Sequence, residues 1–335
     1  MGYVADADVP VIGDPFPVVS SLLAPEALLT EVAHAYALDT LISCRLLRAY
    51  VNDVYLLTTA SDAYVLKVYR AHWRSRSEIA YELDVLSHLA ATGIPTAPAR
   101  RRRDGTLIGA LRAAEGTRYG VLFAFAEGAK PTPPFTAALY YHFGQATARM
   151  HRALDGFASA HARVPLDLAY LIDQPLAALR PRLKRRPDDW AFLVRLADKV
   201  RARVTALGAV GLDWGVCHGD LSLDNVHVTD GDRFTFYDFD SGGPGWRACE
   251  PYGVLQYRPH DNWEAFLEGY RASKRFGPVE VAAVPYFAAA MGIWGMGNRV
   301  RNWTAWSGLW LADDTYFDEQ MAQWRQWDAE WLGES

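Results

Sequence analysis

Apolar and polar residues follow two different periods along the chain, and the change comes near residue 127. Residues 43–59 and 63–69 alternate between apolar and polar positions and are rich in Val, Leu and Tyr. The short polar break between them predicts an antiparallel hairpin. A second hairpin is predicted with its turn at Asp104-Gly105, and the apolar run at 119–126 predicts a buried strand. We therefore expect a small antiparallel sheet in the first part of the chain.

Helical spacing of apolar residues dominates the rest of the chain. In this part helices are predicted at residues 135–154, 174–185, 190–207, 262–276 and 279–292, and two more are predicted in the first part at 24–37 and 75–91. Gly128 and the three prolines that follow it by residue 134 interrupt the pattern and predict a hinge. The pattern thus predicts an α+β fold with two lobes. Residues 1–127 are expected to form the sheet-rich N-lobe, and residues 128–335 the mostly helical C-lobe.

The candidate chemistry lies in the one strand-like stretch of the helical part. This stretch reads H-G-D-L-S-L-D-N, which contains Asp220 and Asn225, and continues to F-Y-D-F-D, which contains Asp238. A turn at Asp230-Gly231 predicts two short paired strands between these segments. The pairing brings the carboxylate of Asp238 back beside the loop with Asp220 and Asn225. Two carboxylates and one carboxamide are suitable ligands for a hard cation such as Mg²⁺.

Phosphoryl transfer needs this combination of groups. Its transition state is loose, so the protein mainly positions the reactants and neutralises charge on the phosphate oxygens. One carboxylate orients the acceptor hydroxyl and accepts its proton. The amide oxygen and the second carboxylate hold Mg²⁺ against the phosphates of ATP.

The pattern H-G-D-x-x-x-x-N followed by D-F-D resembles the aminoglycoside-phosphotransferase and choline-kinase group within the bilobal protein-kinase-like fold. The resemblance implies that Asp220 is the catalytic base, that Asn225 and Asp238 are metal ligands, and that His218 braces the loop. It covers about residues 52–250. After D-F-D the glycine-rich turn S-G-G-P-G resembles the branch with type II homoserine kinase and the bacterial stress-response kinase. No long activation segment ending in A-P-E follows, unlike in protein kinases.

A kinase also needs a cation for the α- and β-phosphates and an anion to hold that cation. Lys67 is the only lysine before residue 130 and lies within an apolar strand, where an unpaired ammonium is costly. Glu82 lies near the apolar face of the following helix, and Glu78 lies one turn earlier, closer to its edge. We expect a Lys67–Glu82 ion pair, with Glu78 as the alternative partner. This pair resembles the strand lysine and helix glutamate of the kinase fold.

The remaining nucleotide contacts carry a weaker signal. Residues 45–62 contain no glycine and therefore no glycine-rich phosphate loop. Asn52 is similar to the asparagine in the corresponding turn of the antibiotic kinases, where its amide would contact a phosphate; an Asx-turn that shapes the hairpin is the other interpretation. The resemblance implies that adenine binds backbone groups near Ala124 and Ala126.

Composition and charge limit the class of protein. Half of the residues are hydrophobic, 22% are charged, and the net charge is −5, which gives no support to nucleic-acid or anionic-membrane binding. The three cysteines are widely spaced and predict neither a disulfide framework nor a metal-ligand pair. No signal peptide is recognised, and the longest apolar stretch, at 281–297, predicts a buried helix. We expect a cytoplasmic protein, and the sequence does not predict its oligomeric state.

The sequence allows two interpretations for several features. Asp240 is a structural cap or a distal metal ligand, and Glu250 stands where that branch usually has an aspartate that braces the catalytic loop. Residues 100–103 are four arginines that form either a solvated hairpin tip or an anion contact. His151 is expected to be a packed or capping histidine. Tryptophans gather in the C-terminal region as core packing or as an aromatic wall over the substrate: Trp294, Trp303, Trp306, Trp310, Trp324, Trp327 and Trp331.

The acceptor is the least determined part of the function. The sequence favours a kinase that phosphorylates a hydroxyl of a small molecule, such as an aminoglycoside-like antibiotic, an amino alcohol or a homoserine-like metabolite. A Ser/Thr protein or peptide kinase of the stress-response type is an alternative, and a nucleotide-binding pseudokinase is a further one. Acidic residues that could receive an amino group are each expected to be solvated surface charges: Asp261, Glu264, Glu268, Asp313 and Asp314.

Overall fold

The computed structural model describes residues 16–230, 232–256, 260–302 and 314–332. Its sheet-rich part begins with a helix and contains five strands and a second helix. These elements are α1 (Pro25–Ala35), β1 (Ser43–Ala49), β2 (Asn52–Thr58), β3 (Ala63–Tyr69), α2 (Arg76–Ala91), β4 (Gly109–Ala113) and β5 (Gly116–Ala124). The strands form one antiparallel sheet in the order β1-β2-β3-β5-β4. The expected antiparallel sheet is confirmed.

Two details of the predicted sheet were wrong. The alternating stretch 43–59 is two strands, β1 and β2, because the chain turns back after Ala49 and pairs with itself. Asp104-Gly105 forms a tight turn before β4, whereas the hairpin joins β4 to β5 through residues 114–115. Alternation alone locates strand-forming residues, but a turn without Gly or Pro leaves little signal.

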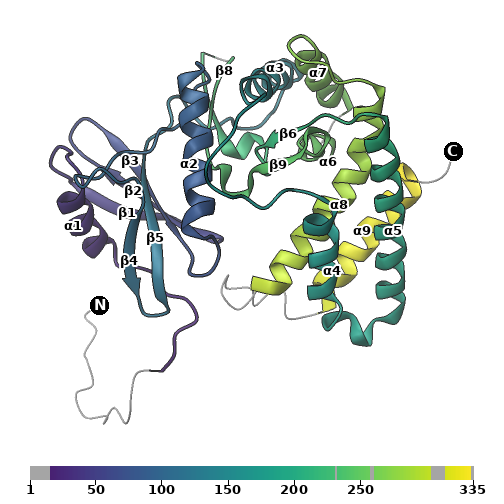
Figure 1. The fold of residues 1–335 in the computed structure, drawn as a ribbon, viewed down its shortest axis with the longest axis horizontal. Coiled ribbons are helices and arrows are strands. Elements are labelled where there is room, and N and C mark those ends of the chain that lie inside the picture. The colour runs from purple at the N-terminus through teal and green to yellow at the C-terminus, as the bar shows by residue number, and fades with distance from the viewer. Residues whose placement is uncertain (1–15, 231, 257–259, 303–313, 333–335) are drawn as a thin grey trace.

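The two helices of this part cover opposite faces of the sheet (Figure 1). Leu28 and Val32 of α1 pack with Tyr55 and Leu57 of β2 in a small separate core. The buried face of α2 belongs instead to the large core that continues into the helical part. Ser75 caps α2 with a reciprocal pair of hydrogen bonds to Glu78, so the helix begins at a fixed residue.

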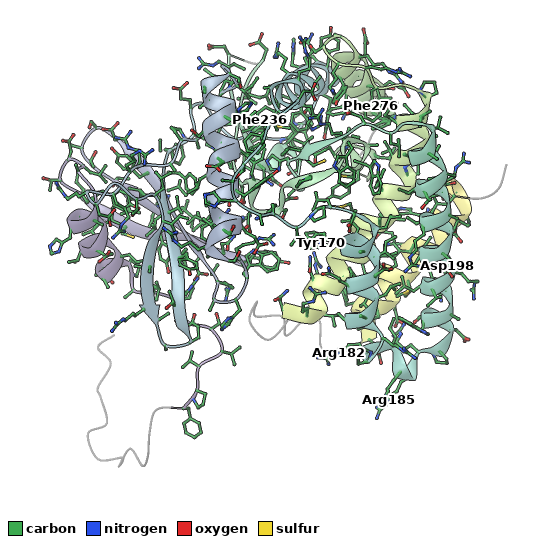
Figure 2. All side chains as sticks on the ribbon, in the orientation of Figure 1. Tyr170, Arg182, Arg185, Asp198, Phe236 and Phe276 are labelled. Atoms are coloured by element: carbon green, nitrogen blue, oxygen red, sulfur yellow. The ribbon has the colours of Figure 1, made fainter. Side chains whose placement is uncertain are left out.

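The second part of the chain is mostly helical (Figure 1). Its helices are α3 (Ala137–Ala153), α4 (Gln174–Leu179), α5 (Pro187–Val210), α6 (Tyr252–Gln256), α7 (His260–Arg271), α8 (Pro278–Asn302) and α9 (Asp314–Trp331). α3 packs along α7, and α8 lies against α4, α5 and α6. In Figure 2, Arg182 and Arg185 lie at the far end of this helical group, whereas Phe236 lies beside α2. These contacts bury the apolar residues whose spacing predicted the helices.

Four short strands hold the predicted catalytic segment. β6 (Trp214–Cys217) pairs with β9 (Gly243–Trp246), and β7 (Val226–Thr229) pairs with β8 (Arg233–Phe236). The predicted β7–β8 hairpin is confirmed, but β9 was missed: the chain after Asp240 enters a strand before the helices. The glycines of β9 gave no apolar alternation to detect.

The two parts of the chain meet along the β7–β8 hairpin. Phe236 exchanges backbone hydrogen bonds with Pro95 and Ala97, and Val228 does so with Ala129. The segments after α2 and after β5 are thereby fixed to the catalytic hairpin. The lobe boundary after residue 127 stays a prediction, although the change from sheet to helices falls beside it.

α8 contains the apolar stretch that was expected to be a buried helix. Among the described helices it is the one long and apolar enough to pass a test for a membrane span. A little over half of its most apolar window, 56%, is buried inside the protein. Its packing against α4, α5 and α6 accounts for this composition without a membrane.

Candidate active site

Lys67 lies on β3 opposite Val54, on the sheet face that α2 covers. Its Nζ donates to Glu82 Oε1 on α2 at 3.0 Å and to Asp238 Oδ1 at 2.7 Å. The other oxygen of Glu82 accepts a hydrogen bond from the Tyr69 hydroxyl at 2.8 Å. The expected Lys67–Glu82 pair is therefore present, and Glu78 instead serves the cap of α2.

Burial and charge oppose each other in this group. Burial alone would lower the pKa of Lys67, but Asp238 and Glu82 outweigh it and hold that pKa well above its usual value. Burial raises the pKa of Glu82, although the Lys67 ammonium acts in the opposite direction. One ammonium thus faces two carboxylates, and the cluster keeps an excess of negative charge.

Asp238 follows β8 in a left-handed backbone conformation, with φ +65° and ψ +55°. A non-glycine residue there is strained, and such strain often occurs at functional sites. The conformation sends the chain away from β8, while the carboxylate contacts Lys67 and lies 3.6 Å from the Arg48 guanidinium.

Asn225 connects Asp220 with the site. Its side-chain nitrogen donates to Asp220 Oδ2 at 2.9 Å and to the Asp220 carbonyl at 2.8 Å. Both contacts are made by the amide nitrogen, so neither of them uses the amide oxygen of Asn225. Desolvation by the surrounding protein raises the pKa of Asp220 to about 6, and the charge of Asp238 adds to this, although the Asp220 side chain can still be reached from solvent.

Glu250 fixes the start of the catalytic loop, as the sequence suggested. Its two carboxylate oxygens accept hydrogen bonds from the backbone nitrogens of His218 at 3.0 Å and Gly219 at 2.9 Å. Gly219 has φ +79°, and a Cβ there would come within 2.2 Å of the Ser241 carbonyl oxygen. Only glycine fits where the loop crosses the chain after D-F-D.

Behind the loop, His218 and His151 are both buried. His218 Nε2 lies 3.0 Å from the Tyr237 carbonyl oxygen, in line with the expected bracing role. His151 Nδ1 lies 2.8 Å from the Tyr270 hydroxyl, and its Nε2 lies 3.5 Å from Glu250. The predicted packed histidine is confirmed, and it supports the carboxylate that holds the loop.

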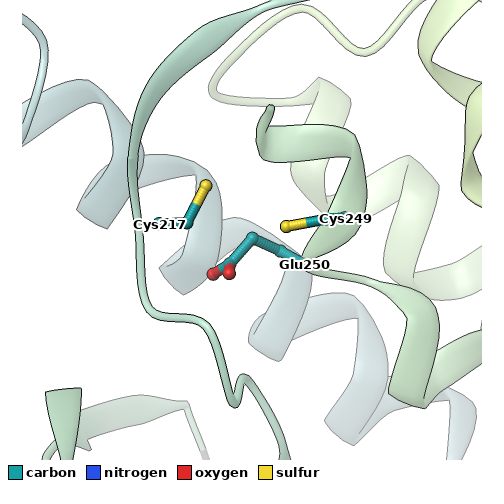
Figure 3. A group of neighbouring side chains, drawn as sticks. All are labelled: Cys217, Cys249 and Glu250. Carbon is teal, nitrogen blue, oxygen red and sulfur yellow. The ribbon is translucent and has the colours of Figure 1, made fainter. Parts of the chain in front are cut away.

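Cys217 and Cys249 lie beside Glu250, and their sulfur atoms face the same small space as its carboxylate (Figure 3). Glu250 already accepts two backbone hydrogen bonds, and burial raises the pKa of Cys217 well above its usual value. A protonated thiol is a poor metal ligand. We interpret this cluster as packing behind the loop.

Of the groups described above, Arg48, Lys67, Glu82, Asn225 and Asp238 line one cavity of about 280 Å³. Its apolar end is lined by side chains from β1, β2, β3, α2, β5 and the segment after α2, namely Leu47, Val54, Val65, Leu86, Phe123 and Ala97. Lys67, Asn225 and Asp238 line its polar end. Ala124 and Ala126 line it as well, as the adenine prediction requires, whereas Asp220 lies outside the lining and reaches it through Asn225.

Asn52 does not occupy the place that the sequence suggested. It does not line the cavity, and its side-chain nitrogen donates to Asp240 Oδ2 at 2.9 Å inside the protein. Neither a phosphate contact nor an Asx-turn matches this geometry, so we do not keep Asn52 as a nucleotide ligand. The partner is 188 residues away in the chain, which no local pattern can indicate.

Asp240 is a buried structural anchor. It accepts hydrogen bonds from Trp73 Nε1 at 2.8 Å and from Arg74 Nε at 3.0 Å, in addition to Asn52. Burial acts to raise its pKa, but Lys67, Arg74 and Arg163 outweigh it and hold that pKa well below its usual value. Of the two interpretations, the structural one fits. The residues that the sequence analysis missed are therefore Trp73, Arg74 and Arg163.

The donor set at the polar end suits a hard divalent cation. Asp238 supplies a carboxylate and Asn225 an amide oxygen, and oxygen ligands of this kind are those that Mg²⁺ prefers. The negative charge left over after Lys67 pairs with two carboxylates favours a cation at the same place.

The other sequence predictions have mixed outcomes. Trp324 is buried and Trp294 packs against Tyr170, which favours core packing, but Trp303, Trp306 and Trp310 lie outside the described residues. The side chains of Asp261, Glu264, Glu268 and Asp314 are exposed, and Asp313 lies outside the described residues. In the arginine run at 100–103, Arg102 pairs with Glu31 and Asp104, which is a structural role.

Comparison with known proteins decides the family. The profile of the phosphotransferase enzyme family APH matches residues 43–284. The chain belongs to this family. A protein of Deinococcus radiodurans is 39% identical over 294 residues, which cover 84% of each chain. The homoserine kinase of Allorhizobium ampelinum is 28% identical over 269 residues, or 75% of this chain and 78% of that enzyme.

Solved structures show the same fold. A microcompartment-associated aminopropanol kinase superposes with a TM-score of 0.68 at 22% identity, over 81% of this chain and 88% of that one. An amicoumacin kinase in complex with AMP-PNP, Ca²⁺ and Ami superposes with a TM-score of 0.69 at 20% identity, over 91% of this chain and 92% of that one. The expectations of a protein-kinase-like α+β fold and of a phosphotransferase are confirmed.

Proposed function

We propose that this family member transfers the γ-phosphate of ATP, with Mg²⁺, to a hydroxyl group of a small molecule. The observation that carries the proposal is the meeting of Lys67, Asn225 and Asp238 at one end of a single cavity, with Asp220 hydrogen-bonded to Asn225. These are a phosphate-binding cation, two oxygen donors for a metal and a proton acceptor. Phosphoryl transfer requires each of them.

Each group has a separate role in the proposal. Lys67, held by Glu82, binds oxygens of the α- and β-phosphates. Asp220 lies within reach of solvent, orients the acceptor hydroxyl and accepts its proton. Asn225 both positions Asp220 through its nitrogen and offers its oxygen to the metal. When bound at Asn225 and Asp238, Mg²⁺ would supply positive charge to neutralise the phosphate oxygens.

The nucleotide base would bind at the apolar end of the cavity. The side chains there form walls for a flat ring, and backbone groups near Ala124 and Ala126 offer the polar partners. The complex of the amicoumacin kinase with AMP-PNP supports ATP as the phosphate donor in this fold.

We infer that the acceptor is a small hydroxyl compound that also carries an amino group. The names of similar proteins support this class: homoserine kinase, aminopropanol kinase and amicoumacin kinase. The negative net charge of the chain favours such a cationic acceptor. A cytoplasmic location is our prediction for an enzyme that draws on ATP.

The test combines binding with turnover. Calorimetry should detect ATP or AMP-PNP binding that becomes stronger with Mg²⁺, and radiolabelled ATP should transfer phosphate to one of a panel of amino alcohols, homoserine and amino-bearing antibiotics. Asp220→Asn should reduce transfer by about 10²–10⁴-fold because it removes the proton acceptor. It should leave nucleotide binding within about twofold, because Asp220 does not line the cavity.

A matched control is Asp232→Asn, which changes an exposed aspartate beside the β7–β8 turn. Transfer by this variant should equal that of the wild type. The proposal fails if wild type and Asp220→Asn transfer phosphate at the same rate, or if label enters only added proteins and no small molecule.

A further inference from the structure

The edge of the cavity formed by β1 and β2 lacks the feature that would normally cover phosphates. Residues 45–62 contain no glycine, so backbone amides cannot approach a phosphate as closely as a glycine-rich loop allows. Asn52, the polar residue nearest to this turn in β2, is engaged by Asp240. A different group must neutralise the phosphates on this side.

A β-bulge brings one cation to this edge. The β1–β2 register slips between Leu46 and Arg48, so that Arg48 lies opposite Val54. Without the slip Arg48 would lie opposite Asp53, which is fully buried on the other face of the sheet. Directly opposed residues share a face. The bulge therefore turns Arg48 toward the cavity that Val54 also lines.

Arg48 is the least engaged of the described cations that line this cavity. Lys67 makes contacts of 3.0 and 2.7 Å with two carboxylates, and Lys130 lies 2.7 Å from Asp224. Arg48 lies 3.6 Å from Asp238, which is beyond hydrogen-bond distance, and its side chain is 59% exposed. It can therefore change partners at little cost, because an exposed ion pair contributes little.

We propose that Arg48 binds the terminal phosphates of the nucleotide and stabilises the phosphoryl group during its transfer. This inference rests on the proposed function. In the transfer, the bond between the γ-phosphorus and the ADP oxygen breaks, a bond to the acceptor oxygen forms, and the acceptor proton moves to Asp220. Arg48 forms no covalent bond; its guanidinium exchanges its contact with Asp238 for phosphate oxygens, which would leave the Asp238 carboxylate to hold the metal.

The chemistry of arginine suits this position. The planar guanidinium offers five donors that match two phosphate oxygens at once, which a lysine ammonium does not. The place is also right, since Arg48 lines the cavity and lies 3.6 Å from Asp238, which lines it together with Lys67 and Asn225.

The experiment compares Arg48→Ala, Arg48→Lys and wild type in binding and in turnover. In calorimetry with Mg²⁺, Arg48→Ala should weaken AMP-PNP binding about tenfold. Adenosine binding should be unchanged, because adenosine has no phosphate for Arg48 to contact. Turnover should fall by about 10²–10³-fold. Arg48→Lys should recover part of the affinity but less of the turnover, since it keeps charge without the two-point contact.

Arg45→Ala is the matched control, because Arg45 is an exposed arginine on the same strand that does not line the cavity. It should behave as wild type. The inference is overturned if Arg48→Ala equals Arg45→Ala, or if it weakens AMP-PNP and adenosine equally. If Lys67→Met loses AMP-PNP binding while Arg48→Ala keeps it, only the role of Arg48 falls. If wild type binds no nucleotide, the proposed function itself falls.

Discussion

A buried network of charged side chains lies on each face of the sheet, and the two networks differ in the role of their charges. On the α1 face, Asp53 pairs with Arg118 and Arg70. On the α2 face, Lys67 pairs with Glu82 and Asp238. The first of these networks is closed and the second opens onto the cavity. In the closed network Asp53 lies on β2, Arg118 on β5 and Arg70 just after β3. In the open network Lys67 lies on β3, between those two strands, whereas Glu82 is on α2 and Asp238 follows β8.

In the closed network two arginines face two carboxylates, because Arg118 also lies 3.8 Å from Glu115, and other donors of Arg118 are used on the backbone. Arg118 and Asp53 are both fully buried and lie 2.8 Å apart. Arg118 also donates to the carbonyl oxygens of Tyr69, Val68 and Ser21 at 2.9–3.1 Å. This arginine thereby ties the segment before α1 to the middle of the sheet. No described part of the network lines the cavity.

The open network is unbalanced. Inside the protein a single ammonium serves two carboxylates. The second cation near Asp238, Arg48, is 59% exposed and lies 3.6 Å away, and the Asp238 side chain remains 24% exposed. A buried network with unequal charges is unfavourable unless another ion completes it. The comparison indicates that ion pairing inside one small sheet has two uses, and that charge balance together with access to a cavity separates them.

Removing the cation of the closed network should have the largest effect. Arg118→Met leaves Asp53 with only Arg70 and frees three carbonyl oxygens, so we expect a loss of about 3–5 kcal/mol in the free energy of unfolding. Urea denaturation measures it. Arg112→Met, at an exposed position on β4, should change stability by less than about 0.5 kcal/mol. Equal stability of the two variants would contradict the structural role of the closed network.

Removing the cation of the open network should act mainly on catalysis. Lys67→Met should reduce phosphate transfer by about 10²–10³-fold, or 2.7–4 kcal/mol, because the phosphates lose a preorganised cation. Steady-state assays and nucleotide calorimetry measure the loss. The exposed Lys184→Met is the control. A Lys67→Met protein with unchanged nucleotide affinity and turnover would mean that both networks are structural.

The brace of the catalytic loop should give a smaller effect that depends on pH. Glu250→Gln replaces a carboxylate that accepts two backbone hydrogen bonds, so we expect a loss of about 1.5–3 kcal/mol near neutral pH. Burial acts to raise the pKa of Glu250, but it is outweighed by His151, His218 and the backbone hydrogen bonds, which hold that pKa below its usual value. A carboxyl group whose pKa is lower in the folded state stabilises the fold fully at pH values above its pKa in the unfolded chain, which is about 4.3 for Glu. This stabilisation is lost as the pH falls through the pKa that the group has in the folded state.

Unfolding curves at several pH values test this sign. The difference between wild type and Glu250→Gln should be constant from neutral pH to about pH 5 and shrink below about pH 4. A difference that grows on acidification would refute the assignment. Glu264→Gln, an exposed control on α7, should show neither the loss nor the pH dependence.

The smallest effect should come from the cap that fixes the start of α2. Ser75→Ala removes the hydrogen bond to the Glu78 nitrogen and should cost about 0.5–2 kcal/mol. Ser87→Ala, at an exposed position within the same helix, should cause no loss. Thermal melts measure both. A large drop in nucleotide affinity for Ser75→Ala would show that the placement of Glu82 depends on the cap more than on Lys67.

The sequence by itself determined those features that short segments carry. The spacing of Asp220, Asn225 and Asp238 lies within one loop and hairpin, so local turn geometry is enough to bring them together. The Lys67–Glu82 pair followed from the burial cost of a lone ammonium beside a helix with one inward-facing carboxylate. The helices followed from their apolar spacing.

Only the tertiary structure decided which polar groups hold the site in place. Asp240 accepts hydrogen bonds from Asn52, Trp73 and Arg74, which lie more than 160 residues away in the chain. Asn52 is therefore bound to Asp240, although the local pattern had assigned it to a phosphate. A one-residue slip in β1 turned Arg48 toward the cavity, and such slips leave no trace in alternation. Long-range partners are fixed by packing of the whole chain, because the free energy of pairing depends on burial that no short segment specifies.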